Sequence, residues 1–239
     1  MKIYHLYHSG VAVEYKQRLL VFDYYDNNPV GKDRNLSGGV INPENLSKYK
    51  EIDVFVSHRH GDHYNPIIFN WREKNNNIKY FLSNDIGKAE KGDNVFYLGQ
   101  DQELSTDDMQ IKTFGSTDLG ISFLVEINGS SIFHAGDLNW WCWKSFSERE
   151  LKREERDYKN EISKLKGEKI DIAFVPVDPR LDKYYYLAGS YFIEEIKPEL
   201  FIPIHFGNRY GITKKFADKM NSCGCRVAVI EKRGDMIKF

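Results

Sequence analysis

The sequence has few cysteines, no long apolar run and almost no net charge. Three cysteines in 239 residues are too few, and odd in number, for a disulfide framework, which indicates reduced thiols. No run of about 18 apolar residues is present, so no ordinary transmembrane helix is expected. Residues 1–5 also lack the apolar core of a signal peptide. We therefore expect a cytoplasmic protein with no membrane partner.

The charge balance argues against a polyanionic partner. The formal net charge is −1, with 34 basic and 35 acidic residues, and the lysines are dispersed rather than gathered into a basic stripe. Nucleic-acid binding is therefore not expected. The hydrophobic fraction of 41% is typical of a globular protein, and the length suits one domain spanning residues 1–239. Oligomeric state cannot be inferred from these values.

Strand and helix patterns alternate after a β-rich start. Helix signals begin at Ser147, which has capping-box spacing to Glu150, and continue to Gly167. Shorter helices are predicted at 190–196 and 214–220, and a short one follows Pro66. Strands are predicted at 2–8, 11–15, 19–24, 52–57, 78–82, 94–98, 109–114, 120–127, 130–134, 171–177 and 200–204. Layer rules alone allow several α/β or α+β arrangements.

The most informative segment is a loop that follows the predicted strand 52–57. Residues 58–63 read His-Arg-His-Gly-Asp-His, so three of the seven histidines of the chain fall within one short turn. Imidazole and carboxylate groups suit zinc, iron or manganese, and a loop can converge ligands that a regular strand would separate. The competing interpretation, a polar surface turn, does not account for this concentration of ligand-type side chains. The loop therefore predicts a metal site.

This loop resembles the His-x-His-x-Asp-His signature of the metallo-β-lactamase superfamily. The segments 133–137 and 202–205 resemble the later strands that end in its bridging aspartate and last histidine. Residues 6–10 and 20–23 resemble the opening hairpin of the lactonase-like branch. The resemblance runs from about residue 4 to about residue 207. It implies an αββα sandwich of two mixed sheets flanked by helices, with a metal centre at one edge.

The resemblance also implies ligand roles. His58 and His60 would hold a first metal position, whereas Asp62, His63 and His205 would hold a second, with Asp137 between them. One or two divalent ions are implied, zinc first, with manganese or iron as alternatives.

One departure from the pattern concerns the first position. The superfamily usually supplies a further histidine before Asp137, and the matching stretch here, residues 114–120, contains none. Asp118 could replace it with an oxygen ligand, which would favour manganese or iron. An ordinary turn is an equal alternative, since Ser-Thr-Asp-Leu-Gly is rich in residues that bond their own backbone.

The implied chemistry is hydrolysis by a metal-activated water, with Asp62 orienting the nucleophile. A small phosphoester or a lactone-type ester is the expected substrate. A non-catalytic or weakly catalytic binding protein of the same fold is the alternative, and an RNA-processing nuclease is disfavoured by the charge.

Three further residues are candidate substrate contacts. His8 lies in the opening hairpin, Trp140 directly follows the proposed bridging aspartate, and Arg180 offers a planar fork for a phosphate or carboxylate. Core packing is an equal explanation for the tryptophan, and a surface turn for the arginine. Cys223 and Cys225 are interpreted as structural, because two thiols without partner ligands are a weak zinc signal.

Overall fold

The computed structural model describes residues 1–87, 90–106 and 108–239. Its contacts group the chain into two compact units. The first unit comprises Met1–Leu98 and Ile230–Phe239, and the second comprises Gly99–Val229. Each unit contains one seven-stranded sheet. Among the described residues, no helix has both the length and the apolarity needed to span a membrane.

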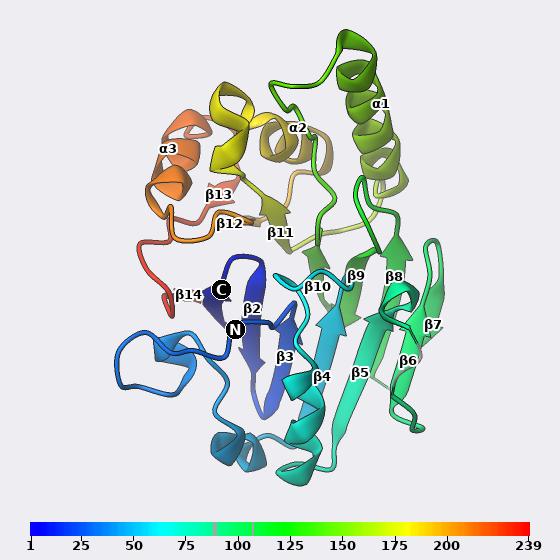
Figure 1. Cartoon of the computed structure of the whole chain (residues 1–239), viewed down its shortest axis with the longest axis vertical. Helices are drawn as coiled ribbons and strands as arrows, with labels where there is room; N and C mark the ends of the chain where they lie inside the picture. The colour runs from blue at the N-terminus through cyan, green and yellow to red at the C-terminus, as the bar shows by residue number, and fades with distance from the viewer. Residues whose placement is uncertain (88–89, 107) are drawn as a thin grey trace. The chain divides into compact units, whose positions relative to one another are not determined.

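The sheet of the first unit is antiparallel on one side and parallel on the other, in the order β14-β1-β2-β3-β4-β5-β6 (Figure 1). Strands β14 to β3 pair antiparallel, whereas β3 to β6 pair parallel. The strands are β1 (Lys2–Tyr7), β2 (Gly10–Tyr15), β3 (Arg18–Phe22), β4 (Glu51–Val56), β5 (Ile78–Ser83), β6 (Val95–Leu98) and β14 (Met236–Lys238).

Short 3₁₀ helices cover one face of this sheet. They are η1 (Leu36–Gly38), η2 (Pro43–Lys48), η3 (Pro66–Glu73) and η4 (Asn84–Ile86). Leu46 of η2 and Trp71 of η3 pack on the alternating apolar residues of β3, β4 and β5. The other face carries a ladder of stacked rings, with centroids of Phe22 and Phe55 4.6 Å apart and those of Phe55 and Phe81 4.9 Å apart. Both faces are apolar, as expected for parallel strands.

The sheet of the second unit has the same plan, in the order β13-β12-β11-β10-β9-β8-β7. Strands β7 to β10 pair antiparallel and β10 to β13 pair parallel. The strands are β7 (Glu103–Ser105), β8 (Met109–Phe114), β9 (Ser122–Ile127), β10 (Ser130–His134), β11 (Ile172–Pro176), β12 (Leu200–Ile204) and β13 (Arg226–Val227).

Three α-helices pack on the second sheet, namely α1 (Glu148–Lys164), α2 (Leu187–Ile196) and α3 (Gly211–Lys219), with the 3₁₀ helix η5 (Pro179–Tyr184) between β11 and α2 (Figure 1). The predicted capping box at Ser147 and Glu150 is present in both directions. Tyr158 of α1 is fully buried and donates a hydrogen bond to the carbonyl oxygen of Ala188 at 2.9 Å. This bond ties α1 to α2.

The larger predicted elements are confirmed. Asn128 and Gly129 both have positive φ, at 51° and 78°, and join β9 to β10 as the two-residue hairpin that their sequence indicated. Helix α2 begins at Leu187, three residues before the predicted start. The three edge strands β7, β13 and β14 were missed because they are only two or three residues long.

Candidate metal centre

The histidine loop follows β4, at the carboxyl end of the parallel half of the first sheet. Strand β3 runs parallel to β4, with Phe22 opposite Phe55, so the residue after each strand reaches the same edge. Asp23 follows β3 and Ser57 follows β4. Ligand-binding residues commonly gather at this edge of parallel strands. We call the group formed by His58, His60, Asp62 and His63 the histidine-loop cluster.

Asp23 supports this cluster through contacts with Ser57 and His63. Its carboxylate is 1% exposed and accepts hydrogen bonds from the backbone and hydroxyl of Ser57, both at 2.7 Å. The same carboxylate lies 2.7 Å from Nδ1 of His63. A carboxylate on Nδ1 fixes the ring orientation and directs Nε2 outward, which is the usual support of a metal-bound histidine.

His58 and His60 form a close nitrogen pair. Nδ1 of His58 lies 2.9 Å from the Ser57 hydroxyl, and its Nε2 lies 3.0 Å from Nδ1 of His60. Two zinc–nitrogen bonds of about 2.0–2.1 Å at a tetrahedral angle place the nitrogens about 3.3 Å apart. The observed separation is close to that value, so this pair fits two ligands of one ion.

Asp62 lies beside His8. Nε2 of His8 is 3.6 Å from an Asp62 carboxylate oxygen, and the Asp62 side chain is 49% exposed. Ligand atoms of His8, Asp62 and His63 all lie within 4.8 Å of one another. The structure thus brings the predicted substrate contact His8 to the loop itself, at the end of the β1–β2 hairpin.

The second unit holds a matching pair of ligand-type residues. Asp137 follows β10 and His205 follows β12, and Nε2 of His205 lies 3.1 Å from a carboxylate oxygen of Asp137. Nδ1 of His205 lies 3.1 Å from Asp178, which follows β11. This Asp137–His205 pair therefore repeats the arrangement in which Nδ1 is held by a carboxylate and Nε2 faces the ligand position.

Arg180 strengthens this support. Its guanidinium donates bonds to both carboxylate oxygens of Asp178, the shortest at 2.6 Å. Burial opposes ionisation of Asp178, but the hydrogen bonds from His205 and Arg180 outweigh it and lower its pKa to about 2. The guanidinium also lies 5.4 Å from the ring centroid of Trp143. Arg180 thus lies beside His205, with its side chain 48% exposed.

Asp118 lies in a turn that passes close to Asp137. Its backbone nitrogen donates to the Ser116 hydroxyl at 3.2 Å, as in a turn, yet one of its carboxylate oxygens lies within 4.8 Å of an oxygen of Asp137. The Thr117 hydroxyl donates a hydrogen bond to the carbonyl oxygen of Asn139 at 2.6 Å. It also accepts a hydrogen bond from the backbone nitrogen of Asn139 at 3.0 Å. These bonds hold the loop next to the Asp137–His205 pair.

The described ring contacts of Trp140 are with residues of α1 and α2, and its role as a substrate contact stays a prediction. Its ring packs on Tyr158 and Tyr191 and lies under the ammonium group of Lys159. The tryptophan beside the ligand pair is Trp141, whose ring centroid is 5.6 Å from that of His205.

The supporting residues Asp23 and Asp178 were not singled out as site residues from the sequence. Asp23 is the first residue after β3 and Asp178 the second residue after β11, at the strand ends where the candidate ligands occur. A buried acid at such a strand end was the available signal.

The comparisons with known proteins concern the fold. No protein-family model matches the chain. The structure is similar over its full length to the metallo hydrolase Igni18 of the archaeon Ignicoccus hospitalis, with a TM-score of 0.71, 18% identity and coverage of 100% and 98% of the two chains. A candidate metal-dependent hydrolase of Parabacteroides distasonis has a TM-score of 0.66 and 19% identity, with coverage of 96% and 92%.

The description of a third similar structure identifies the fold. The metallo-β-lactamase fold protein YhfI of Bacillus subtilis matches with a TM-score of 0.59 and 13% identity, over 99% of this chain and 98% of that one. This chain has the metallo-β-lactamase fold. The predicted class, two mixed sheets flanked by helices, is confirmed, and assignment to the lactonase-like branch stays a prediction.

The donor set fits a divalent metal on geometry internal to each unit. In His58, His63 and His205, Nδ1 lies within 3.1 Å of a hydroxyl or carboxylate oxygen. The two close ligand pairs have separations of 3.0 and 3.1 Å. Imidazole with carboxylate suits zinc, iron or manganese, so the residues fit a divalent cation without selecting one.

Proposed function

We propose that this chain is a metal-dependent hydrolase whose ligands come from the histidine-loop cluster and the Asp137–His205 pair. The observation that carries the proposal is the anchoring of three imidazoles through Nδ1, because polar surface turns do not need a buried hydroxyl or carboxylate behind each histidine. His58, His60 and His63 would be ligands from the loop, and Asp137 and His205 from the second sheet. Hydrolase activity of proteins with similar structures supports the proposal.

The chemistry divides between the cation and the side chains. A divalent cation, when bound, lowers the pKa of a water to about 7 and so supplies hydroxide at neutral pH. Asp62 would orient the nucleophile and accept its proton, and its half-exposed side chain beside His8 supports this role. His8, whose Nε2 lies 3.6 Å from the carboxylate, would help to position Asp62.

We propose a compact ester, either a small phosphoester or a lactone-type ester, as substrate. Arg180 supports this choice, since a guanidinium beside a ligand histidine can bind a phosphate or a developing carboxylate through its fork. Trp141 and Trp143 stack with centroids 5.6 Å apart and offer an apolar wall for the rest of the substrate. Zinc is the first choice of metal, with manganese or iron preferred if Asp118 is a ligand.

The test combines metal content with hydrolysis. Purified protein should contain one or two equivalents of divalent metal by mass spectrometry and should hydrolyse bis(p-nitrophenyl) phosphate or a simple lactone. His63→Ala and His205→Ala should each lose metal and activity, whereas Asp101→Asn, on a surface ion pair with Lys164, should lose neither. Bound metal without hydrolysis of either substrate class would favour a binding protein, and a folded protein that takes up no added metal would refute both functions.

A further inference from the structure

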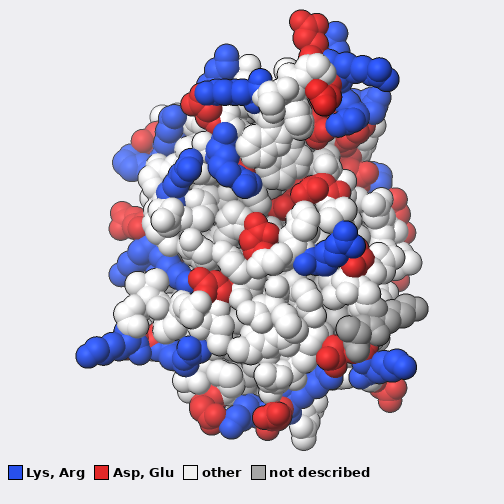
Figure 2. Space-filling view, in the orientation of Figure 1, with Lys and Arg blue, Asp and Glu red and all other residues white. Residues whose placement is uncertain are grey.

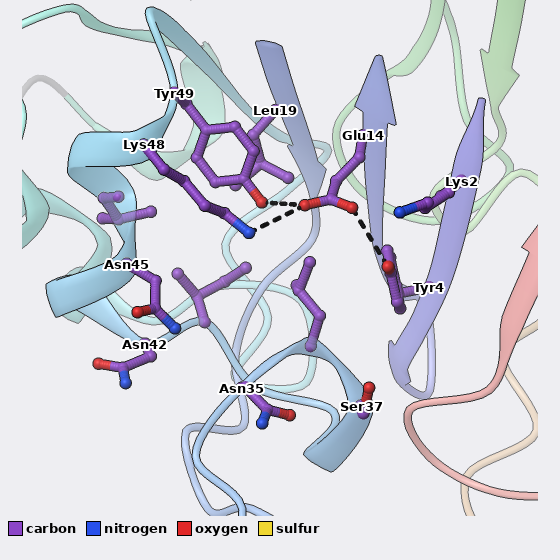
Figure 3. A pocket seen from close by; sticks show the side chains of 13 residues that line it. Lys2, Tyr4, Glu14, Leu19, Asn35, Ser37, Asn42, Asn45, Lys48 and Tyr49 are labelled. Carbon is purple, nitrogen blue, oxygen red and sulfur yellow. Dashed lines mark hydrogen bonds and ion pairs between the residues drawn. The ribbon is translucent and has the colours of Figure 1, made fainter. Parts of the chain in front are cut away.

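A pocket of about 310 Å³ lies on the first unit, away from the histidine loop (Figure 3). It is lined by Lys2 and Tyr4 at the start of β1, whereas His8 lies beyond the end of that strand. It is also lined by Leu19 of β3, roughly 13 Å along the strand from Asp23 at about 3.3 Å per residue. The pocket is therefore at the opposite end of these strands from the proposed metal ligands.

The pocket has an apolar floor and aromatic walls. Leu19, Ile41 and Leu46 are at most 2% exposed and form the floor with Leu36. Tyr4 and Tyr49 stand beside it on opposite sides of Glu14 (Figure 3). The volume is at the lower end of the range for small-molecule sites, about 300–1,000 Å³. It suits a compact molecule with an apolar or ring-shaped body.

Glu14 is already engaged by its neighbours. Its carboxylate accepts hydrogen bonds from the Tyr4 hydroxyl at 3.1 Å and from the ammonium of Lys48 at 3.1 Å, and also from the Tyr49 hydroxyl. Burial disfavours the charged form, but the bonds from Tyr49 and Lys48 outweigh it and lower the pKa of Glu14. Glu14 and Lys48 thus form a pair without net charge, held between two tyrosines.

Two asparagines present hydrogen-bond donors. The side-chain oxygen of Asn35 accepts from the backbone nitrogen of Gly38 at 3.0 Å, and that of Asn42 accepts from the backbone nitrogen of Glu44 at 3.1 Å. These are the caps of η1 and η2. Because the amide oxygens are held by the backbone, the amide nitrogens are the donors that these two side chains can offer to other partners.

The charge of the pocket is positive. Its lining contains Lys2 and Lys48 against Glu14 alone, which gives +2 − 1 = +1. An adjoining hollow of about 630 Å³ shares Lys2, Glu14, Lys48 and Tyr49 and adds two more lysines, Lys16 and Lys238, with no further acidic side chain. Basic and acidic side chains are otherwise interspersed over the face drawn in Figure 2. This local excess of lysine favours an anion.

We infer that this pocket binds a compact organic oxyanion, a carboxylate or a phosphate monoester on a small apolar or ring-shaped body. Lys2 would attract the oxyanion, Asn35 and Asn42 line the pocket farther from it (Figure 3), and the body would cover the floor formed by Leu19 and its neighbours. The inference does not depend on the proposed hydrolase function, because none of these residues belongs to the metal clusters.

Calorimetric titration of the full chain with benzoate and with phenyl phosphate tests this inference, with benzamide as the neutral comparison. Chelator-treated protein is used, so that binding to metal cannot contribute. Both anions should bind more tightly than benzamide, and added salt should weaken them. The stronger of the two anions identifies whether the site prefers a carboxylate or a phosphate.

Two isosteric variants sharpen the test. Asn35→Asp and Asn42→Asp keep the capping oxygen, since aspartate is an equally good N-cap, but replace a donor nitrogen by a negatively charged oxygen. Each should weaken anion binding at least tenfold, and Lys2→Gln should weaken it about tenfold. Asn70→Asp makes the same change at an exposed position outside the pocket and should leave binding unchanged.

Three outcomes would overturn the inference. They are benzamide binding as tightly as the anions, unchanged affinity in both capping variants, and failure of both anions to bind in the millimolar range.

Discussion

Replacing Asp23 by asparagine tests whether the buried carboxylate prepares His63 to bind metal. The change keeps the shape of the side chain but exchanges one oxygen for an amide nitrogen. In the native protein one carboxylate oxygen faces both the Ser57 hydroxyl and Nδ1 of His63 at 2.7 Å. An amide nitrogen at that place requires an unprotonated Nδ1, which moves the proton of neutral His63 to Nε2. The ring atom that should meet the metal would then carry a hydrogen.

The expected loss follows from this change of tautomer. Removing a supporting partner of a metal-bound histidine costs roughly 10–100-fold in metal affinity, and a factor of ten corresponds to about 1.4 kcal/mol. We expect the upper part of that range for Asp23→Asn, because the carboxylate is 1% exposed and no water can replace it easily. Zinc titration of chelator-treated protein against a chromophoric chelator measures the affinity directly.

Asp53→Asn is the matched control. Asp53 is also a buried acid, in the neighbouring strand β4, and accepts from Arg18 at 2.6 Å, but it does not contact a histidine of the loop in any described interaction. It should lower the stability of the fold and leave zinc affinity unchanged. Native zinc affinity in folded Asp23→Asn protein would show that the carboxylate is only a structural support of Ser57, and the tautomer argument would fail.

Three further predictions concern the second unit. Asp118→Ala should lower metal affinity about tenfold if its carboxylate is a ligand, and an unchanged metal titration would leave it as a turn residue. Gly189→Ala places a Cβ 2.6 Å from Cζ of Phe216, so urea denaturation should show a net loss of about 1 kcal/mol after the gain in helix propensity, and a more stable variant would contradict the packing. Burial raises the pKa of Asp171, but its bonds with Lys169 and Ser131 outweigh this and lower the pKa below 3.8. The stability contributed by Asp171 should therefore be present above about pH 4 and lost as the pH falls through its folded pKa. Asp171→Asn should accordingly cost about 1–3 kcal/mol at pH 7 and progressively less in acid, and an equal cost at both pH values would refute the assignment.

The sequence predicted the parts of the fold that depend on local patterns. Apolar runs such as 52–56 and 200–204 became strands β4 and β12, and the capping box fixed the start of α1. The helices η1, η2, η4 and η5 were not predicted, since short 3₁₀ segments have no hydrophobic periodicity and depend on caps such as Asn42.

The site was predictable to the extent that its residues form a short motif. The histidine loop can be recognised in the sequence as a motif. Asp23 and Asp178, in contrast, are single acids whose roles depend on which strands are neighbours in the sheet. Trp140 and Trp141 show the same limit. Both follow Asp137, but successive side chains leave the backbone in different directions, so only the folded loop determines that Trp141 is the one beside His205.

The backbone at these strand ends supports a functional interpretation of both clusters. Asp23 and His205, which directly follow β3 and β12, have φ of 46° and 66°. Positive φ is uncommon outside glycine and costs energy that the surrounding structure must supply. At Lys16 and Asn128 the same conformation closes a hairpin and needs no other cause. His205, in contrast, ends a buried parallel strand where glycine would fold more easily, and its side chain makes the contacts with Asp137 and Asp178. Selection for the imidazole itself, rather than for the turn, is the physical reason to keep a histidine in that conformation.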